Sequence, residues 1–112
     1  MPYRPMHRLP LFLAASLIYA LPVRADCLLP APPGHIPDGR VASEPEMRAA
    51  MRTLQQYNED VDEYGKCLEF EQRVKHVSPY DQEKQRTVAM ETRANVVEQF
   101  NQQVRLWKAR RS

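Results

Sequence analysis

The residues with the most distinctive chemistry in this chain are its two cysteines, Cys27 and Cys67. Two thiols can bridge each other, stay free or bridge two chains, and an oxidising compartment outside the cytoplasm favours the internal bridge. A disulfide here would close a loop of about 41 residues and stabilise a small fold by about 4 kcal/mol in the chain-entropy model. We therefore predict a structural disulfide, with free thiols or an intermolecular bridge as the alternatives.

Other catalytic or metal-binding signatures are missing from the sequence after residue 25. Neither His35 nor His76 shares a local motif with a nucleophile, and there is no glycine-rich phosphate loop or Cys-x-x-Cys pair. Residues 58–63 resemble half of a calcium loop but lack its central glycine and fall within a helical repeat. We expect a solvent-exposed helix face there, holding a cation weakly at most, through Glu59, Asp62 and Glu63. The sequence thus predicts a protein that is not an enzyme and has no cofactor or metal.

A basic cluster lies near the end of the chain. Its members are Arg105, Lys108, Arg110 and Arg111, with Trp107 among them. Such a cluster can contact anionic lipid headgroups or stack on a nucleic-acid base. Cations at the end of a helix also complement the helix dipole, and an aromatic residue can continue an apolar stripe. We favour this second interpretation and keep a weak contact with a membrane surface as the alternative.

Residues 1–25 have the pattern of an export signal. A basic start precedes an apolar stretch from Leu9 to Leu21, and small or modest residues precede a predicted cut after Ala25. The stretch is short for a membrane span, and an uncleaved anchor is the alternative. Cleavage removes three arginines and no acid, so the net charge changes from +2 to about −1. The basic isoelectric point is therefore no nucleic-acid signature, and the mature protein is predicted to be periplasmic or secreted.

Two segments of different composition must position the cysteines. Residues 26–42 contain four prolines and two glycines, which predict an extended, polyproline-like segment. Within it, residues 36–39 (Ile-Pro-Asp-Gly) fit a type I turn. The segment is long enough to run back along the helices that follow, where a disulfide would hold it. The apolar residues expected to cover the groove between those helices are Leu28, Leu29, Ile36 and Val41.

Residues 43–112 predict an antiparallel, coiled-coil-like hairpin of two helices. Ser43-Glu44-Pro45-Glu46 is a capping box that starts a first helix over about 44–77. Apolar residues then recur at alternating steps of three and four. They are Met47, Ala50, Leu54, Tyr57, Val61, Tyr64 and Leu68. This seam is expected to lose phase at Glu71, with the apolar face continuing through Phe70, Val74 and Val77. Gly65 is either a site of close approach or a weak point of the helix.

The second helix is predicted over about 79–110, after a stop at residues 78–81. Its expected apolar stripe contains Met90, Val97, Phe100, Val104 and Trp107, flanked by Ala89, Ala94 and Val96. Arg86 and Arg93 interrupt the first half of that stripe. A short connection between two helices of similar length indicates antiparallel pairing. The predicted fold is all-α: a helical hairpin with a proline-rich segment stapled to it.

The order of several motifs resembles a family of small exported proteins of Gram-negative bacteria that have no assigned activity. The motifs, all within residues 27–68, are Cys27, the proline-rich stretch, Ile36-Pro37-Asp38-Gly39, Ala42-Ser43, Glu46-Met47, Tyr57, Tyr64 and Cys67-Leu68. The resemblance implies a periplasmic, disulfide-linked helical protein. It implies no activity or partner.

Two functions fit these features. The first is a non-enzymatic protein–protein interaction or structural module, self-associating or bound to another protein through an exposed aromatic seam. The seam residues expected at the interface are Tyr57, Tyr64, Phe100 and Trp107. The alternative is a chaperone-like protein or a binder of anionic envelope lipid. That function would use the basic cluster of Arg105, Lys108, Arg110 and Arg111.

Overall fold

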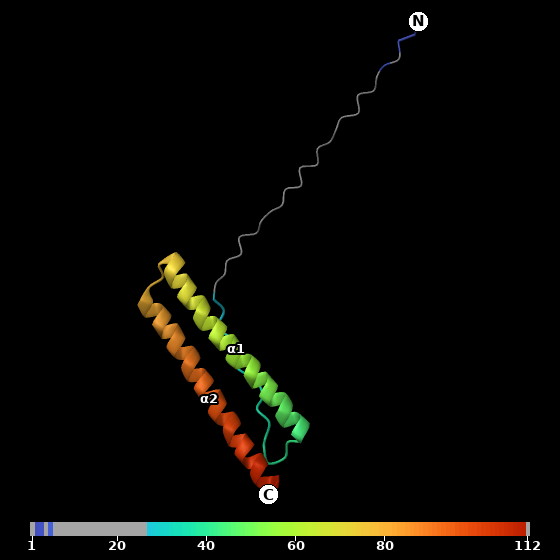
Figure 1. Ribbon diagram of the computed structural model, residues 1–112, viewed down its shortest axis with the longest axis vertical. Helices are drawn as coiled ribbons and strands as arrows, with labels where there is room; N and C mark the ends of the chain where they lie inside the picture. Colours follow the sequence, from blue (N-terminus) through green and yellow to red (C-terminus); the bar gives the residue numbers. More distant parts are fainter. Residues whose placement is uncertain (1, 4, 6–26, 112) are drawn as a thin grey trace.

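Two long antiparallel helices make up most of the described chain. The computed structural model describes residues 2, 3, 5 and 27–111. Helix α1 (Glu44–Lys75) and helix α2 (Pro79–Arg111) lie side by side, and the extended segment 27–42, here called the strap, runs along them (Figure 1). The predicted hairpin with an extended segment stapled to it is therefore confirmed. Apart from residues 2, 3 and 5, the predicted export signal lies outside the described residues.

Local interactions start α1 where the capping box predicts. The Ser43 hydroxyl accepts the backbone N–H of Glu46 at 3.3 Å, and the Glu46 carboxylate accepts the N–H of Ser43 at 2.7 Å. The helix ends at Lys75 because His76 adopts a left-handed conformation with φ of 51°. Pro79 then opens α2. The predicted bounds of 44–77 and 79–110 thus differ from the observed ones by one or two residues.

The predicted seam of α1 forms its contact with α2. Its buried members are Met47, Leu54, Tyr57, Val61, Tyr64 and Leu68. The expected loss of phase at Glu71 is wrong, because the side chain of Glu71 takes the next seam position and is only 14% exposed. A carboxylate is tolerated there because it accepts the N–H of Cys27 at 3.2 Å. Phe70 and Val74, expected to continue the apolar face, are half exposed.

The stripe that α2 buries includes Phe100, as predicted, but its first half is shifted by one residue to the predicted flank at Ala89 and Val96. Its buried residues are Gln82, Ala89, Val96 and Phe100. Met90 belongs to the predicted stripe but is exposed, and Val97 and Val104 only pack against the edge of the core. The buried set lies at seven- and four-residue steps, which continue the heptad spacing of α1.

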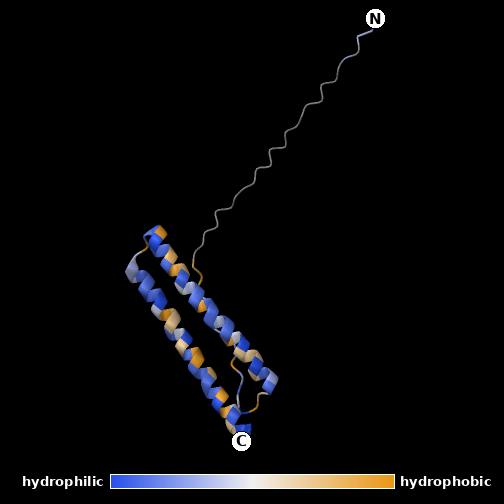
Figure 2. Cartoon of the chain, viewed as in Figure 1, coloured by the Kyte–Doolittle hydropathy of each residue, from blue (hydrophilic) through white to orange (hydrophobic). Residues whose placement is uncertain are grey.

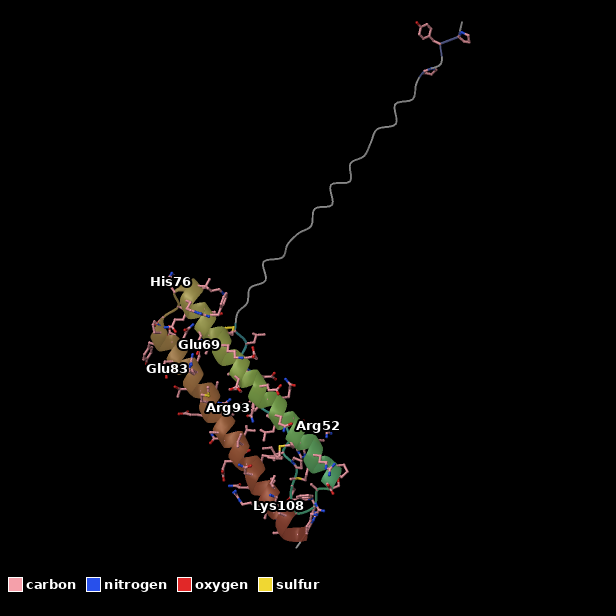
Figure 3. The ribbon with its side chains drawn as sticks, viewed as in Figure 1. Arg52, Glu69, His76, Glu83, Arg93 and Lys108 are labelled. Atoms are coloured by element: carbon pink, nitrogen blue, oxygen red, sulfur yellow. A yellow bond between two sulfur atoms is a disulfide. The ribbon has the colours of Figure 1, made fainter. Side chains whose placement is uncertain are left out.

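Arg86 and Arg93 lie between those buried residues, at seam positions. The guanidinium of Arg93 reaches Asp62 of α1 at 2.7 Å, and that of Arg86 reaches Glu69 at 3.4 Å. Figure 3 labels one member of each pair, Arg93 on α2 and Glu69 on α1. A long arginine can pack its methylene stem against an apolar seam while its charged end meets an acid at the rim. The two arginines that interrupt the predicted stripe therefore belong to the helix–helix contact.

The strap is held at both ends. A disulfide joins Cys27 to Cys67, with the Cα atoms 5.7 Å apart, as predicted. At the other end Arg110 donates to the carbonyl oxygens of Arg40 and Ala42, at 2.8 and 2.7 Å. Figure 2 shows that both helices are mainly hydrophilic, with apolar residues recurring along them and in the strap. Ile36 and Ala42 pack into the groove between the helices, but Leu28, Leu29 and Val41 are exposed and do not cover it.

The turn of the strap lies two residues later than predicted. The N–H groups of Val41 and Ala42 donate to the carbonyl oxygen of Asp38, at 3.1 and 2.8 Å. The Asp38 carboxylate also accepts the backbone N–H of Arg40 at 3.0 Å, as aspartate commonly does in turns. Residues 38–41, rather than 36–39, therefore reverse the chain before α1.

Gly39 lets this turn contact the backbone of α2. Its N–H donates to the side-chain oxygen of Gln103 at 2.8 Å. A Cβ at this position would lie 2.8 Å from the carbonyl carbon of Gln103 and 3.0 Å from the amide nitrogen of Trp107. Gly65 differs, because a Cβ there would meet nothing within 4 Å. Close approach explains Gly39, whereas Gly65 is a weak point of α1.

Candidate interaction site

The aromatic residues predicted to face a partner lie mainly inside the molecule. Tyr57, Tyr64 and Phe100 belong to the buried core between the helices, and burial raises the pKa of both tyrosines. Trp107 is partly buried against the same core. The rings expected to form an exposed seam therefore pack between α1 and α2, where they hold the hairpin together instead of forming a surface.

The predicted basic cluster is largely engaged within the chain. Arg110 holds the strap turn, and the Arg111 guanidinium lies 4.5 Å from the centre of the Trp107 ring. Arg111 also lies 3.9 Å from Glu44 across the hairpin, and Arg105 lies 3.1 Å from Glu98. Lys108 is exposed at the end of α2 (Figure 3). The structure thus brings three of these four cations into intramolecular contacts.

The acidic run of α1 is an exposed helix face. Asp62 pairs with Arg93, and Glu63 pairs with Lys66 at 3.0 Å. Within the described residues, side chains close enough to share a metal ion occur at Cys27, Cys67 and Glu71, whose ligand atoms lie within 4.8 Å of one another. Because the two sulfur atoms are bonded to each other, this group acts as the staple of the strap.

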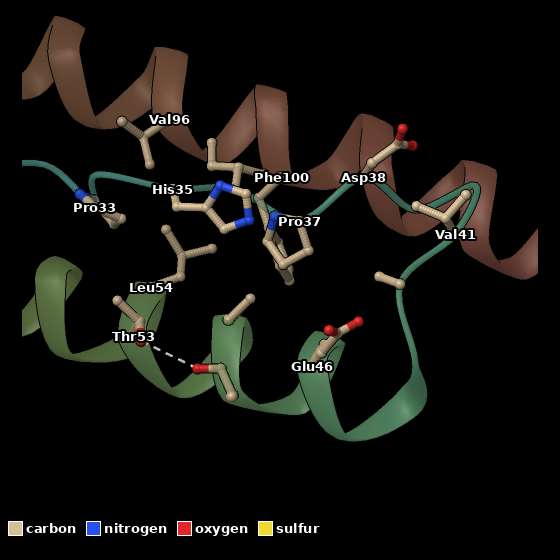
Figure 4. A pocket seen from close by; sticks show the side chains of 14 residues that line it. Pro33, His35, Pro37, Asp38, Val41, Glu46, Thr53, Leu54, Val96 and Phe100 are labelled. Atoms are coloured by element: carbon tan, nitrogen blue, oxygen red, sulfur yellow. Dashed lines mark hydrogen bonds between the residues drawn. The ribbon is translucent and has the colours of Figure 1, made fainter.

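A pocket of about 470 Å³ opens between the strap, the first three turns of α1 and the middle of α2 (Figure 4). We call it the strap pocket. Its lining residues are Pro33, His35, Ile36, Pro37, Asp38, Val41, Ala42, Glu46, Ala49, Ala50, Thr53, Leu54, Val96 and Phe100. Its volume falls in the range of about 300–1,000 Å³ that is usual for ligand sites.

The wall of the strap pocket is mostly apolar, with a few polar groups. The Thr53 hydroxyl donates to the carbonyl oxygen of Ala49 at 3.1 Å, within α1 itself. The hydrogen bond from Arg40 lowers the pKa of the Asp38 carboxyl below its ordinary value. Glu46 belongs to the capping box, and Figure 4 shows its carboxylate directed from α1 toward the strap. An apolar wall with one available carboxylate suits an apolar ligand that carries a polar or charged group.

The sequence interpretation did not identify this pocket. On α1 the pocket is lined by three small residues: Ala50, which belongs to the apolar seam, and Ala49 and Thr53, which lie beside it. Small residues on one side of a helix leave space for a pocket where a proline-rich segment runs along that side. These small residues indicate a pocket only once it is known that the strap runs along that side of α1.

No protein-family model, curated protein or solved structure matches the chain. The resemblance to a family of exported proteins therefore stays a prediction. Among the described residues, neither helix is apolar enough along its length to cross a membrane. The geometry of the strap pocket thus carries the functional argument.

Proposed function

We propose that this protein acts outside the cytoplasm, in the periplasm or after secretion, as a non-enzymatic module that binds another protein. The strap pocket is its binding site. The predicted export signal and the disulfide between Cys27 and Cys67 support the location, since disulfides persist mainly in oxidising compartments.

One observation carries this proposal. The strap, α1 and α2 together line an open apolar pocket, and the strap, which covers the pocket, is held at both ends. The disulfide holds one end of the strap, and the hydrogen bonds from Arg110 hold the other. Because the strap is already ordered before binding, association loses less conformational entropy than it would with a mobile loop. The staple therefore serves recognition as well as stability.

The alternative, an anionic-lipid binder or chaperone-like protein, has less support. It needs a free basic surface, whereas Arg105, Arg110 and Arg111 contact Glu98, the strap and Trp107 within the chain. Self-association through the aromatic seam also has less support, because those rings lie in the core between the two helices or pack against it.

Site-specific photocrosslinking in intact cells tests the proposal. A photoreactive amino acid replaces Thr53 in the wall of the strap pocket, and the control replaces Gln55, an exposed residue of α1 outside that wall. We expect a discrete adduct with another polypeptide from position 53 and none from position 55. The adduct should disappear when Ala49→Leu fills the pocket. Equal adducts from both positions, or an adduct that survives Ala49→Leu, would refute the strap pocket as the binding site.

A further inference from the structure

We infer that the strap pocket binds a short extended segment of the partner protein, made of apolar residues and ending in a lysine or arginine beside Glu46. This inference rests on the proposed function and adds the chemistry of the partner. It follows from the length of the pocket and from the charges in its wall.

The length of the pocket matches a few residues of extended chain. On α1 the wall runs from Glu46 to Leu54. Eight helical steps span about 12 Å along the helix axis. An extended chain advances about 3.3 Å per residue, so about four residues fit this length. The apolar wall has Leu54 and Val96 at the end away from Glu46 and Phe100 between (Figure 4), and it suits apolar side chains on that segment.

The charges in the wall favour a cation at the other end. The wall contains the acids Asp38 and Glu46, the imidazole of His35, and no lysine or arginine. Asp38 is already paired with Arg40 at 2.9 Å. Glu46 binds the N–H of Ser43 through one carboxylate oxygen, and its other oxygen has no partner within the described part of the chain. A lysine or arginine of the partner would pair with that oxygen, whereas an acid would be repelled.

Nuclear magnetic resonance titration of the oxidised, exported protein tests this chemistry with three capped peptides. The first is acetyl-Lys-Leu-Ala-Leu-amide, and the other two carry Gln or Glu in place of Lys. We expect the backbone amides of Ala49 and Thr53 to shift on binding. Because a solvent-exposed ion pair contributes modestly, the Gln peptide should bind about two- to fivefold more weakly than the Lys peptide, and the Glu peptide more weakly again.

Two variants and a matched control separate charge from shape. Glu46→Gln keeps the capping box, in which glutamine can replace glutamate, and should make the Lys and Gln peptides bind equally. Ala49→Leu should abolish binding of all three peptides. Ala94→Leu makes the same change at an exposed position of α2 outside the strap pocket and should leave binding unchanged.

The outcomes distinguish this inference from the proposed function. Equal affinity for the three peptides, lost in Ala49→Leu, would overturn the cationic specificity and leave a pocket for apolar segments. Absence of amide shifts with every peptide at millimolar concentration would overturn binding of a short extended segment altogether. A pocket-specific crosslink to a polypeptide from position 53 would still support the proposed function in either case.

Discussion

Replacing Gly39 and Gly65 by alanine should change stability in opposite directions. Both substitutions add one methyl group to a glycine whose φ is not positive, so the backbone conformation does not separate them. The surroundings do. The methyl group at position 39 would overlap the backbone of α2 at Gln103, whereas at position 65 it would enter open space.

The magnitudes follow from these surroundings. In Gly39→Ala, overpacking against a backbone that cannot move aside costs about 1–3 kcal/mol. Retreat of the strap also breaks the hydrogen bond from Gly39 to Gln103, which is worth about 1 kcal/mol. We therefore expect a loss of about 2–4 kcal/mol in the free energy of unfolding. In Gly65→Ala the better helix propensity of alanine should add about 1 kcal/mol.

Urea unfolding of the oxidised protein, followed by circular dichroism at the helical band, measures both changes. Thermal unfolding gives a second readout, since the melting temperature of a domain of this size should change by about 4–8 °C for each kcal/mol of stability. Gly34→Ala is the control within the strap. A Cβ at position 34 meets nothing within 4 Å, so this variant should not show the loss of stability expected for Gly39→Ala. If Gly39→Ala were as stable as the parent, the packing of the strap turn on α2 would be wrong. If Gly65→Ala were less stable than the parent, the open space beside Gly65 would be wrong.

Three further predictions concern the staple, the helix start and the buried tyrosines. Replacing both Cys27 and Cys67 by serine should lower the free energy of unfolding by about 4 kcal/mol, measured by urea unfolding; an unchanged midpoint would refute the staple. Ser43→Ala should cost about 1 kcal/mol in the same assay, while Glu46→Gln costs little because it keeps the cap; equal effects would contradict the capping box. Burial raises the pKa of Tyr57 and Tyr64 in the folded state, so the unfolded chain loses these protons first as pH rises above 10.0. Stability should therefore be level below that pH and fall above it, and changing both residues to phenylalanine should reduce the fall in urea midpoints measured between pH 8 and 11.

The helical part of the fold was largely predictable because its signals are local. The capping box at Ser43 and Glu46 needs only four consecutive residues, and the seam of α1 repeats over about three heptads. Two cysteines in a chain with a predicted export signal likewise leave few pairings. These features depend on residue types and spacing along the chain, which the sequence contains directly.

The first half of the α2 stripe was misplaced by one residue, although Phe100 is buried as predicted, because the apolar pattern there is ambiguous. Met90, Val97 and Val104 form an apolar row one position away from Ala89 and Val96, and two arginines occupy the true seam. Arg86 and Arg93 fit there only because Glu69 and Asp62 lie opposite them on α1. Which acid lies opposite each arginine depends on the register of α2 against α1. The sequence of α2 alone does not show that register.

Local patterns were enough to predict the two helices, the start of the first, the seam of α1 and the disulfide, since each depends on neighbours in the chain or on the only thiol pair within it. The course of the strap, the need for glycine at position 39 and the packing of the predicted interface aromatics in or against the core follow from the contacts between distant segments. These contacts also create the strap pocket, whose wall joins residues from positions 33 to 100. The physical reason is that packing brings together groups that are distant along the chain. Which of these groups touch depends on how the strap, α1 and α2 are aligned with one another, and this alignment is set only when they pack together.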